Sequence, residues 1–431
     1  MPEIQPEAAL IIHPVFTSVP VSERGDVVQA IEEACGLAEA INLNIAQAMQ
    51  VNISRINPGY LFGKGTRENI AKAVEEHKPD IVMVNHTLSP VQQRNLEKEL
   101  KAKIIDRTGL ILEIFGARAQ TKEGRIQVEL AQLEYQRSRL VKSWSHLERQ
   151  RGGQSFVGGP GESQLEIDRR LIAERISNLK KELGKVRKTR ELGRKARERV
   201  PFPVVALVGY TNAGKSTLFN RLTGANVFAK DLLFATLDPT LRRIELPSGR
   251  IVILSDTVGF IADLPTHLIE AFRATLDQTR HADVILHVRD STQTDYDAHK
   301  VEVIRIMADL GINYKEDERV FEVINKIDIC SDARRNEIDR EAQFHDHILP
   351  ISAQTGENID HLLQTVDEFL SRNFNQIRYN VPVSDGRALA WLYQHAEVLE
   401  TEEGEDVTKL LVYIDPANQN RFEDQFSYAP N

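Results

Sequence analysis

Apolar and polar positions follow two different periods along the first part of the chain. The short apolar runs Ala9–Ile12 and Ile81–Val84 have the length of buried strands, while Val27–Met49 and Thr66–Glu76 carry the spacing of amphipathic helices. Because strands that alternate with helices form a sheet covered by those helices, residues 1–120 are predicted to form a small α/β domain.

The pattern changes from Gly124 onward to that of two long helices. One apolar series contains Leu130, Leu133, Leu140, Trp144 and Leu147. A second series contains Ile172, Ile176, Leu179, Leu183 and Val186. The glycine- and proline-rich stretch SFVGGPGESQ (155–164) separates them, so residues 121–200 are predicted to form an antiparallel helical hairpin. A first helix of about 25 residues would carry the tip roughly 35–40 Å from the base. The alternative is that the hairpin only packs between the domains.

Strands and helices alternate again in residues 201–371. The continuous apolar run Val204–Val208 is typical of a strand buried on both faces, and the alternation continues to about Leu370. A doubly wound, mostly parallel sheet is therefore the predicted fold class of this domain.

The last part of the chain, residues 372–431, has a shorter and weaker pattern. A helix is predicted at Ala388–Val398, an acidic turn at Glu402–Asp406 and a strand at Thr408–Ile414. These elements indicate a small α+β domain, and no chemical motif identifies its role.

Length and composition exclude several classes of protein. A chain of 431 residues with 41% hydrophobic and 27% charged residues exceeds one core and is typical of a globular multidomain protein. No apolar run approaches the roughly 20 residues of a membrane span, and the first residues lack the features of a signal peptide, so we expect a cytoplasmic protein. Cys35 and Cys330 lie far apart, which argues against a disulfide framework and a zinc site.

Charge is distributed unevenly along the chain. The formal net charge is −9, yet residues 169–199 hold thirteen basic and four acidic residues. This local excess of positive charge creates a field that attracts phosphate groups. A solvated basic helix without a partner is the alternative.

The strand Val204–Val208 is followed by GYTNAGKS, which fits the phosphate-binding loop GxxxxGKS and precedes a helix. Backbone N–H groups of such a loop bind phosphate, its lysine reaches the β- and γ-phosphates, and its serine ligates Mg²⁺. The residues expected to contact the nucleotide are Gly209, Tyr210, Thr211, Asn212, Ala213, Gly214, Lys215 and Ser216.

The identity of the base follows from a second motif after the strand Val320–Ile324. The Asp328 carboxylate can accept hydrogen bonds from the N1–H and 2-amino groups of guanine, and adenine offers neither donor. We expect Asn325 to tie this loop to the phosphate loop and Lys326 to lie over the ring. The full base-binding set is Asn325, Lys326, Ile327 and Asp328, with Ser352, Ala353 and Gln354 supplying a backbone donor to the guanine carbonyl oxygen.

Two segments between these motifs are the predicted switches. We expect Asp256 to hold Mg²⁺ through water, the Gly259 amide to bind the γ-phosphate, and Thr236 to be the second hydroxyl ligand, with Thr240 as the alternative. The switch residues are Phe234, Ala235, Thr236, Leu237 and Asp238, then Asp256, Thr257, Val258 and Gly259. The predicted metal ligands are Ser216, Thr236 and Asp256, and the predicted catalytic residues are Lys215, Thr236, Gly259 and Asn212.

Phe260 stands where many GTPases carry the glutamine that orients the attacking water. An apolar side chain cannot do so, and slow intrinsic hydrolysis is therefore expected. An oxygen of Asn212 could hold a K⁺ ion beside the phosphates, which predicts stimulation by K⁺; alternatively Asn212 only braces the loop.

Further segments are more diagnostic, because no general chemistry demands them. They are NPGYLFGKGTRENI (57–70), LSPVQQRNLE (88–97), IDRTGLILEIFGARAQTKEGRIQVELAQLEY (105–135) and GGPGESQLEIDRRLI (158–172). With GYTNAGKSTLFN, LFATLDPT, DTVGF and NKID, they resemble the HflX family of ribosome-associated GTPases, within the Obg-like translation-factor superclass.

That resemblance implies a partner and an activity. The family binds the large (50S) ribosomal subunit and dissociates stalled or idle 70S ribosomes with GTP, typically under heat or other stress, and its hairpin tip reaches 23S rRNA near the peptidyl transferase centre. A monomer is expected. An RNA-binding assembly or anti-association factor, in which GTP sets affinity only, remains the alternative; a splitting assay with a non-hydrolysable analogue separates the two.

The resemblance also implies ATP binding by the N-terminal domain. Gly59, Gly63, Lys64 and Gly65 form a weak second phosphate-binding pattern, which is more often a simple turn. A tRNA-modification GTPase is disfavoured, because the chain has no modification domain and no reactive C-terminal cysteine. His281 and His287 fit core or capping positions better than catalytic ones.

Overall fold

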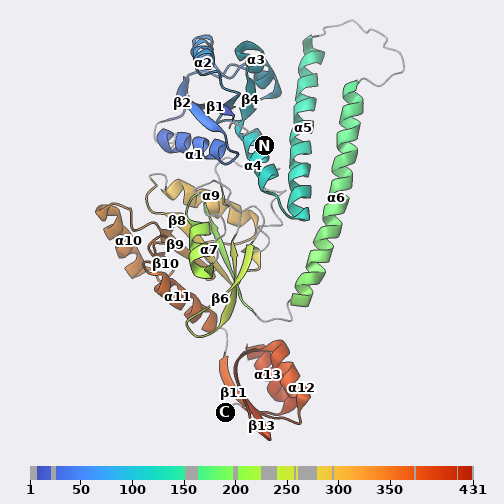
Figure 1. The fold of residues 1–431 in the computed structure, drawn as a ribbon, viewed down its shortest axis with the longest axis vertical. Helices are drawn as coiled ribbons and strands as arrows, with labels where there is room; N and C mark the ends of the chain where they lie inside the picture. Colours follow the sequence, from blue (N-terminus) through green and yellow to red (C-terminus); the bar gives the residue numbers. More distant parts are fainter. Residues whose placement is uncertain are drawn as a thin grey trace, which may run out of the picture. The chain divides into compact units, whose positions relative to one another are not determined.

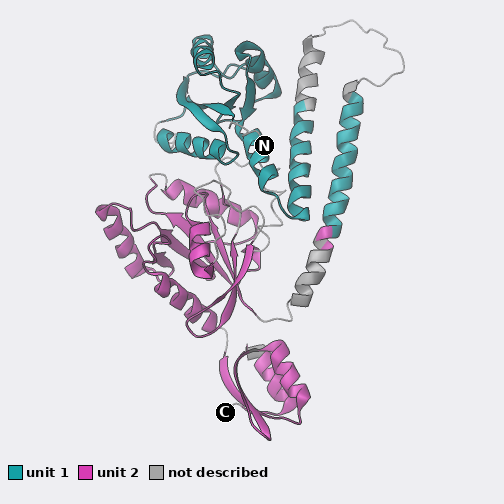
Figure 2. Cartoon of the chain, in the orientation of Figure 1, with its two compact units in different colours: residues 1–185, 230–238, 261–274 teal, residues 186–229, 239–260, 275–431 magenta. Residues whose placement is uncertain are grey.

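The computed structural model describes most of the chain. The described residues are 7–20, 26–150, 164–197, 202–224, 240–256, 259–260, 279–293, 296–372, 375–414 and 416–429. The chain divides into two compact units (Figure 2). One unit comprises residues 1–185, 230–238 and 261–274, and the other comprises residues 186–229, 239–260 and 275–431.

The N-terminal domain is a parallel sheet with helices around it (Figure 1). Its strands are β1 (Ala8–Phe16), β2 (Asn44–Ile53), β3 (Ile81–Val84) and β4 (Lys103–Asp106), in the order β2-β1-β3-β4. Its helices are α1 (Val27–Glu39), α2 (Lys64–His77), α3 (Pro90–Leu100) and α4 (Arg107–Arg118). Leu10, Phe62 and Leu96 are buried between the sheet and these helices, which confirms the α/β prediction.

The prediction of one helix across Val27–Met49 is wrong beyond Glu39. The chain turns there, with Asn42 in the left-handed region at φ 62°, and residues 44–53 become the edge strand β2. Every second side chain of β2 is exposed along most of its length, which is the period of a strand rather than a helix.

The helical hairpin consists of α5 (Lys122–Gln150) and α6 (Gln164–Arg197), which run side by side in Figure 1. Ile176, Leu179 and Leu183 of α6 are buried. Three ion pairs join the two helices: Lys122–Glu182 at 2.9 Å, Glu129–Arg175 at 2.6 Å and Glu134–Lys180 at 2.9 Å. No helix among the described residues is long and apolar enough to cross a membrane.

A six-stranded sheet forms the core of the second unit (Figure 1). The strands are β5 (Val204–Gly209), β6 (Thr240–Glu245), β7 (Ile251–Asp256), β8 (Val284–Asp290), β9 (Val320–Asn325) and β10 (Ile348–Pro350), in the order β10-β9-β8-β5-β7-β6. All pairs are parallel except β6 with β7. The helices are α7 (Lys215–Thr223), α9 (Tyr296–Asp309), α10 (Asp332–Phe344) and α11 (Ile359–Ser371). This arrangement confirms the predicted mostly parallel sheet.

The C-terminal domain is α+β, as predicted, but with more elements than the sequence indicated. It contains β11 (Asn375–Pro382), β12 (Glu397–Glu403), β13 (Val407–Ile414), α12 (Gly386–His395) and α13 (Pro416–Phe426). The strands form an antiparallel sheet in the order β11-β13-β12. The helix predicted at Ala388–Val398 ends at His395, because Glu397 and Val398 already pair with β13.

The turn between β6 and β7 joins this domain to the larger sheet. Ser248 donates to the buried Asp367 carboxylate of α11 through both its N–H and its hydroxyl, each at 2.8 Å. The guanidinium of Arg250, which is fully buried, lies over the ring of Tyr413 in β13 at 3.9 Å from its centroid. One tight turn therefore contacts both α11 and the C-terminal sheet.

Replacement of Arg250 by alanine tests this joint. Loss of a buried guanidinium and its stacking on Tyr413 is expected to destabilise the second unit by about 2–4 kcal/mol. Thermal unfolding of the full chain should then begin at a lower temperature. Arg242→Ala, an exposed position on the same hairpin, is the control and should leave the transition unchanged; equal effects of the two changes would contradict this role of Arg250.

Candidate nucleotide-binding site

The phosphate-binding loop connects the carboxyl end of β5 to the first turn of α7, where the sequence motif placed it. Gly214 begins the helix at φ 92°, and a Cβ there would lie 2.1 Å from the Asn325 side chain. Only glycine fits so close an approach at positive φ. The helix N-terminus behind this glycine favours a bound anion.

Lys215 lies inside the loop rather than in solvent. Its Nζ donates to the carbonyl oxygen of Tyr210 at 2.6 Å, and the side chain is buried. Burial lowers the pKa of Lys215 to about 8, while the nearby Asp256 carboxylate opposes this shift. A phosphate group beside the amine would raise this pKa again, because a nearby negative charge favours the protonated form.

Two oxygen groups of the kind that suits a divalent cation lie next to each other. The Ser216 hydroxyl donates to the Asp256 carboxylate at 3.1 Å. A hydroxyl and a carboxylate are the hard oxygen donors that Mg²⁺ prefers, so this pair fits the predicted metal. Thr236 lies outside the described residues, and the alternative Thr240 is the first residue of β6, paired with Asp256 across the ladder.

Asn325 connects the phosphate loop to the predicted guanine loop. It is buried, its Nδ2 donates to the Ala213 carbonyl at 2.9 Å, and its Oδ1 accepts from the Ala353 N–H at 2.9 Å. The bracing role expected from the sequence is therefore present. The Ala353 N–H and the Ser352 N–H are already bonded, so of the three residues expected to supply a backbone donor, Gln354 is the exposed one whose N–H has no acceptor among the described residues.

The other guanine-motif residues lie at the same edge of the sheet. Asp328 is exposed after β9, while Ile327 is buried beneath the loop. The Lys326 ammonium forms an ion pair of 2.7 Å with Asp290, at the end of β8. Sequence reasoning missed Asp290, although a carboxylate at the carboxyl end of a neighbouring parallel strand is a usable signal.

Phe260 packs against the phosphate loop. Its side chain is buried, its carbonyl accepts from the Thr211 N–H at 2.7 Å, and its N–H donates to the Gly209 carbonyl at 3.0 Å. Phe260 thus anchors the chain directly after the second switch through its backbone. A buried phenyl ring cannot orient water, in agreement with the sequence-based expectation.

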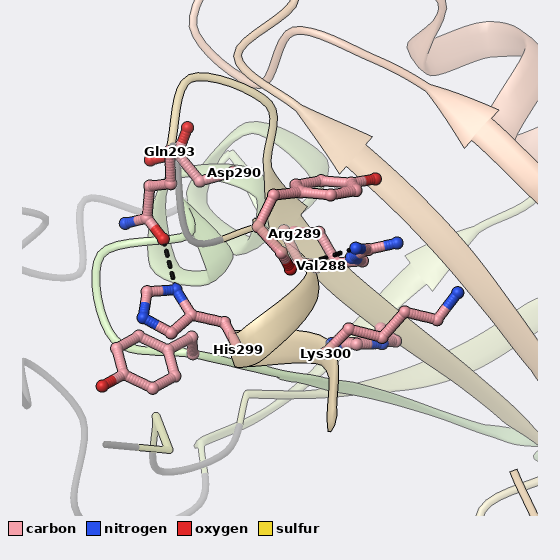
Figure 3. A pocket seen from close by; sticks show the side chains of 9 residues that line it. Val288, Arg289, Asp290, Gln293, His299 and Lys300 are labelled. Carbon is pink, nitrogen blue, oxygen red and sulfur yellow. Dashed lines mark hydrogen bonds between the residues drawn. The ribbon is translucent and has the colours of Figure 1, made fainter. Parts of the chain in front are cut away.

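Tyr210 of the phosphate loop is held by a histidine, His299, that the sequence analysis did not identify. The rings of Tyr210 and His299 stack with centroids 3.8 Å apart. Figure 3 shows the second contact of this histidine, in which His299 Nδ1 donates to Gln293 Oε1 at 2.5 Å. The cavity beside them is about 10 Å³, room for one water at most. This contact therefore supports the loop and is no second ligand site.

Several predicted residues lie elsewhere or outside the described residues. The first-switch residues Phe234–Asp238 and the pair Thr257 and Val258 are among those not described, as is the glycine-rich hairpin tip. His287 is buried in β8, where burial lowers its pKa to about 3, so it is a core residue as expected. His281 is exposed in the turn before β8.

The second glycine pattern lies in the N-terminal unit. Gly63 and Lys64 begin α2, and the Lys64 side chain is 84% exposed with Glu68 one turn away at 4.0 Å. ATP binding there stays a prediction.

Four family models match the chain in order. They are described as GTP-binding GTPase N-terminal (residues 28–116), GTP-binding GTPase Middle Region (118–197), 50S ribosome-binding GTPase (204–326) and HflX C-terminal domain (337–427). A relative named GTPase HflX, from Magnetococcus marinus, is 48% identical over 91% of this chain and 90% of its own. The chain belongs to the HflX family. It is a GTPase, with GTP as substrate and the Mg²⁺ requirement typical of this family.

Other similarities agree with this assignment. GTPase HflX of Escherichia coli is 42% identical over 90% of this chain and 88% of its own. A solved structure described as the SsGBP and GDP complex matches 85% of this chain and 99% of its own, at 23% identity and a TM-score of 0.52. Likeness at that identity concerns the fold alone.

Asn325→Ala should break the connection between the phosphate loop and the loop after β10. The change leaves the Ala213 carbonyl and the Ala353 N–H without their buried partner, so the affinity for GDP should fall by about 100-fold, the equivalent of two lost buried hydrogen bonds. Fluorescence titration with a labelled GDP measures this. The control is Asn336→Ala, an exposed position on α10; an unchanged affinity in Asn325→Ala would contradict the bridging role.

Proposed function

We propose that this GTPase binds the large ribosomal subunit and dissociates 70S ribosomes in its GTP-bound state, during recovery from heat or other stress. The basic hairpin contacts 23S rRNA, and the GTPase domain sets the affinity according to its nucleotide. The family model that matches the GTPase domain, described as 50S ribosome-binding GTPase, supports a ribosomal partner.

In this proposal the GTP site uses the residues expected from the sequence, of which Thr236 lies outside the described residues. Lys215 and the backbone of residues 209–216 bind the β- and γ-phosphates, while Ser216 and Asp256 hold Mg²⁺, which would neutralise phosphate charge. Asp328 binds the guanine edge, Asn325 braces it, and Lys326 covers the ring. Gly259 and Thr236 respond to the γ-phosphate.

The proposed contact with the ribosome rests on a row of lysines on α6. Lys181, Lys185 and Lys188 are exposed and lie three and four residues apart, on one side of the helix. The buried Ile176, Leu179 and Leu183 lie on the opposite side. A row of lysines pointing away from the helix partner is suited to an RNA backbone.

The ion pairs of α6 show that part of the positive charge of residues 169–199 is used within the hairpin. Arg175 and Lys180 are basic, but they pair with Glu129 and Glu134 of α5 and serve the hairpin itself. Among the described side chains of α6, Arg175 and Lys180 therefore hold the hairpin, whereas Lys181, Lys185 and Lys188 are exposed on the other side of the helix.

Charge reversal along this row of lysines tests this assignment. The triple variant Lys181→Glu, Lys185→Glu, Lys188→Glu should bind purified large subunits at least tenfold more weakly. The slope of log affinity against log salt should become shallower by about two to three, because three phosphate contacts are lost. The control reverses three exposed lysines of the N-terminal domain, Lys98, Lys101 and Lys103; equal weakening in both variants would contradict a specific role for α6.

A K⁺ ion beside the phosphates is part of the proposal. Asn212 is exposed in the phosphate loop, so its side chain is accessible to a bound nucleotide and a cation. Hydrolysis in KCl should exceed that in NaCl at equal ionic strength by about tenfold or more, because one transition-state charge contact contributes up to about 100- to 1,000-fold. Equal rates in the two salts would contradict it.

A further inference from the structure

The loop after β10 satisfies nearly all of its backbone donors internally. Ser352 N donates to the Glu357 carbonyl at 3.1 Å, Gly356 N to the Ser352 carbonyl at 2.9 Å, and Thr355 N to the Ser352 hydroxyl at 3.0 Å. Glu357 N donates to the Thr355 hydroxyl at 3.3 Å, and Asn325 accepts from Ala353 N at 2.9 Å. Among the described residues, the Gln354 N–H is the one donor between 352 and 357 left for a ligand.

Arg221 of α7 holds the opposite side of this loop. Its Nε donates to the Ala353 carbonyl at 2.6 Å, and its Nη2 donates to the Gln354 carbonyl. The loop lies so close that a Cβ on Gly356 would be 2.8 Å from Arg221 Nη1, and Gly356 has φ 93°. A side chain there would push the guanidinium away from both carbonyls.

The first of these bonds acts on the free donor directly. The Ala353 C=O and the Gln354 N–H belong to one planar trans peptide, so they point in opposite directions. A donor fixed on the carbonyl therefore fixes the direction of the N–H. Hydrogen bonding to the carbonyl also polarises the peptide and strengthens the N–H as a donor.

We propose that Arg221 is a positioning residue for guanine recognition, which aims the Gln354 N–H at the O6 oxygen of the base. This inference rests on the proposed guanine site. Arg221 lies in the same helix as Lys215, so a single rigid element sets the phosphate contact and, through the loop, the contact to the base.

Nucleotide analogues separate this role from a general effect on α7. GDP and IDP both carry the O6 acceptor, and IDP lacks only the 2-amino group. In 6-thio-GDP the oxygen is replaced by sulfur, a weak acceptor, while the N1–H and the 2-amino group remain. Equilibrium titration of the full chain with the three diphosphates, for wild type and Arg221→Gln, gives the coupling between Arg221 and O6.

Arg221→Gln should lower the affinity for GDP and for IDP by about tenfold, the scale of a charge-assisted contact. The affinity for 6-thio-GDP should fall by about twofold or less. The rate constant of hydrolysis at saturating GTP should not change. Arg221→Lys keeps the charge but cannot span both carbonyls, so it should fall between. Arg340→Gln, which removes an exposed arginine bonded to its own helix, is the control and should change nothing.

Two results would overturn the inference. An equal loss of affinity for all three nucleotides would show that Arg221 supports α7 and the phosphate contacts instead of the N–H that binds O6. No loss of affinity would show that Arg221 has no role in nucleotide binding. If wild type itself does not prefer GDP to 6-thio-GDP, the proposed guanine site fails rather than the role of Arg221.

Discussion

The buried amide of Asn325 is the contact on which the arrangement of the nucleotide site depends. One side chain connects the Ala213 carbonyl of the phosphate loop to the Ala353 N–H of the loop after β10. These segments lie far apart in sequence, and each follows a different strand of the parallel sheet. Because both bonds are buried, neither loop can move without leaving a polar group unsatisfied, and this cost holds the distance between phosphate and base contacts constant.

The same sheet connects the site to the rest of the second unit. β7 ends at Asp256, whose carboxylate accepts from Ser216, and begins just after the turn that contacts α11 and Tyr413. Phe260 then returns the chain to the phosphate loop through two backbone bonds. Hydrogen bonds therefore hold the chain on both sides of the second switch, at the Asp256 carboxylate and at the Phe260 backbone.

Residues that contact the ligand could be predicted from the sequence, because the ligand requires a particular chemical group. Residues that only support those contacts could not be predicted. Lys215, Asp256 and Asn325 occupy the positions expected, because phosphate, Mg²⁺ and guanine each demand a particular group at a strand end. Arg221 and His299 act through the Ala353 carbonyl and the Tyr210 ring, contacts that exist only after folding. The misplaced helix end at Glu39 has another cause: the first half of β2 contains Ala46, Gln47, Ala48 and Met49, which have high helix propensity, and pairing with β1 overrides that propensity.

A GTPase that works on ribosomes should be limited by its partner, because its own second switch offers a buried phenyl ring where others have glutamine. The most direct measurement is GTP hydrolysis by the full chain with and without purified large ribosomal subunits, at one salt concentration. This account predicts slow intrinsic turnover and stimulation by the subunit of tenfold or more. A hydrolysis rate that does not change on addition of the large subunit would contradict it.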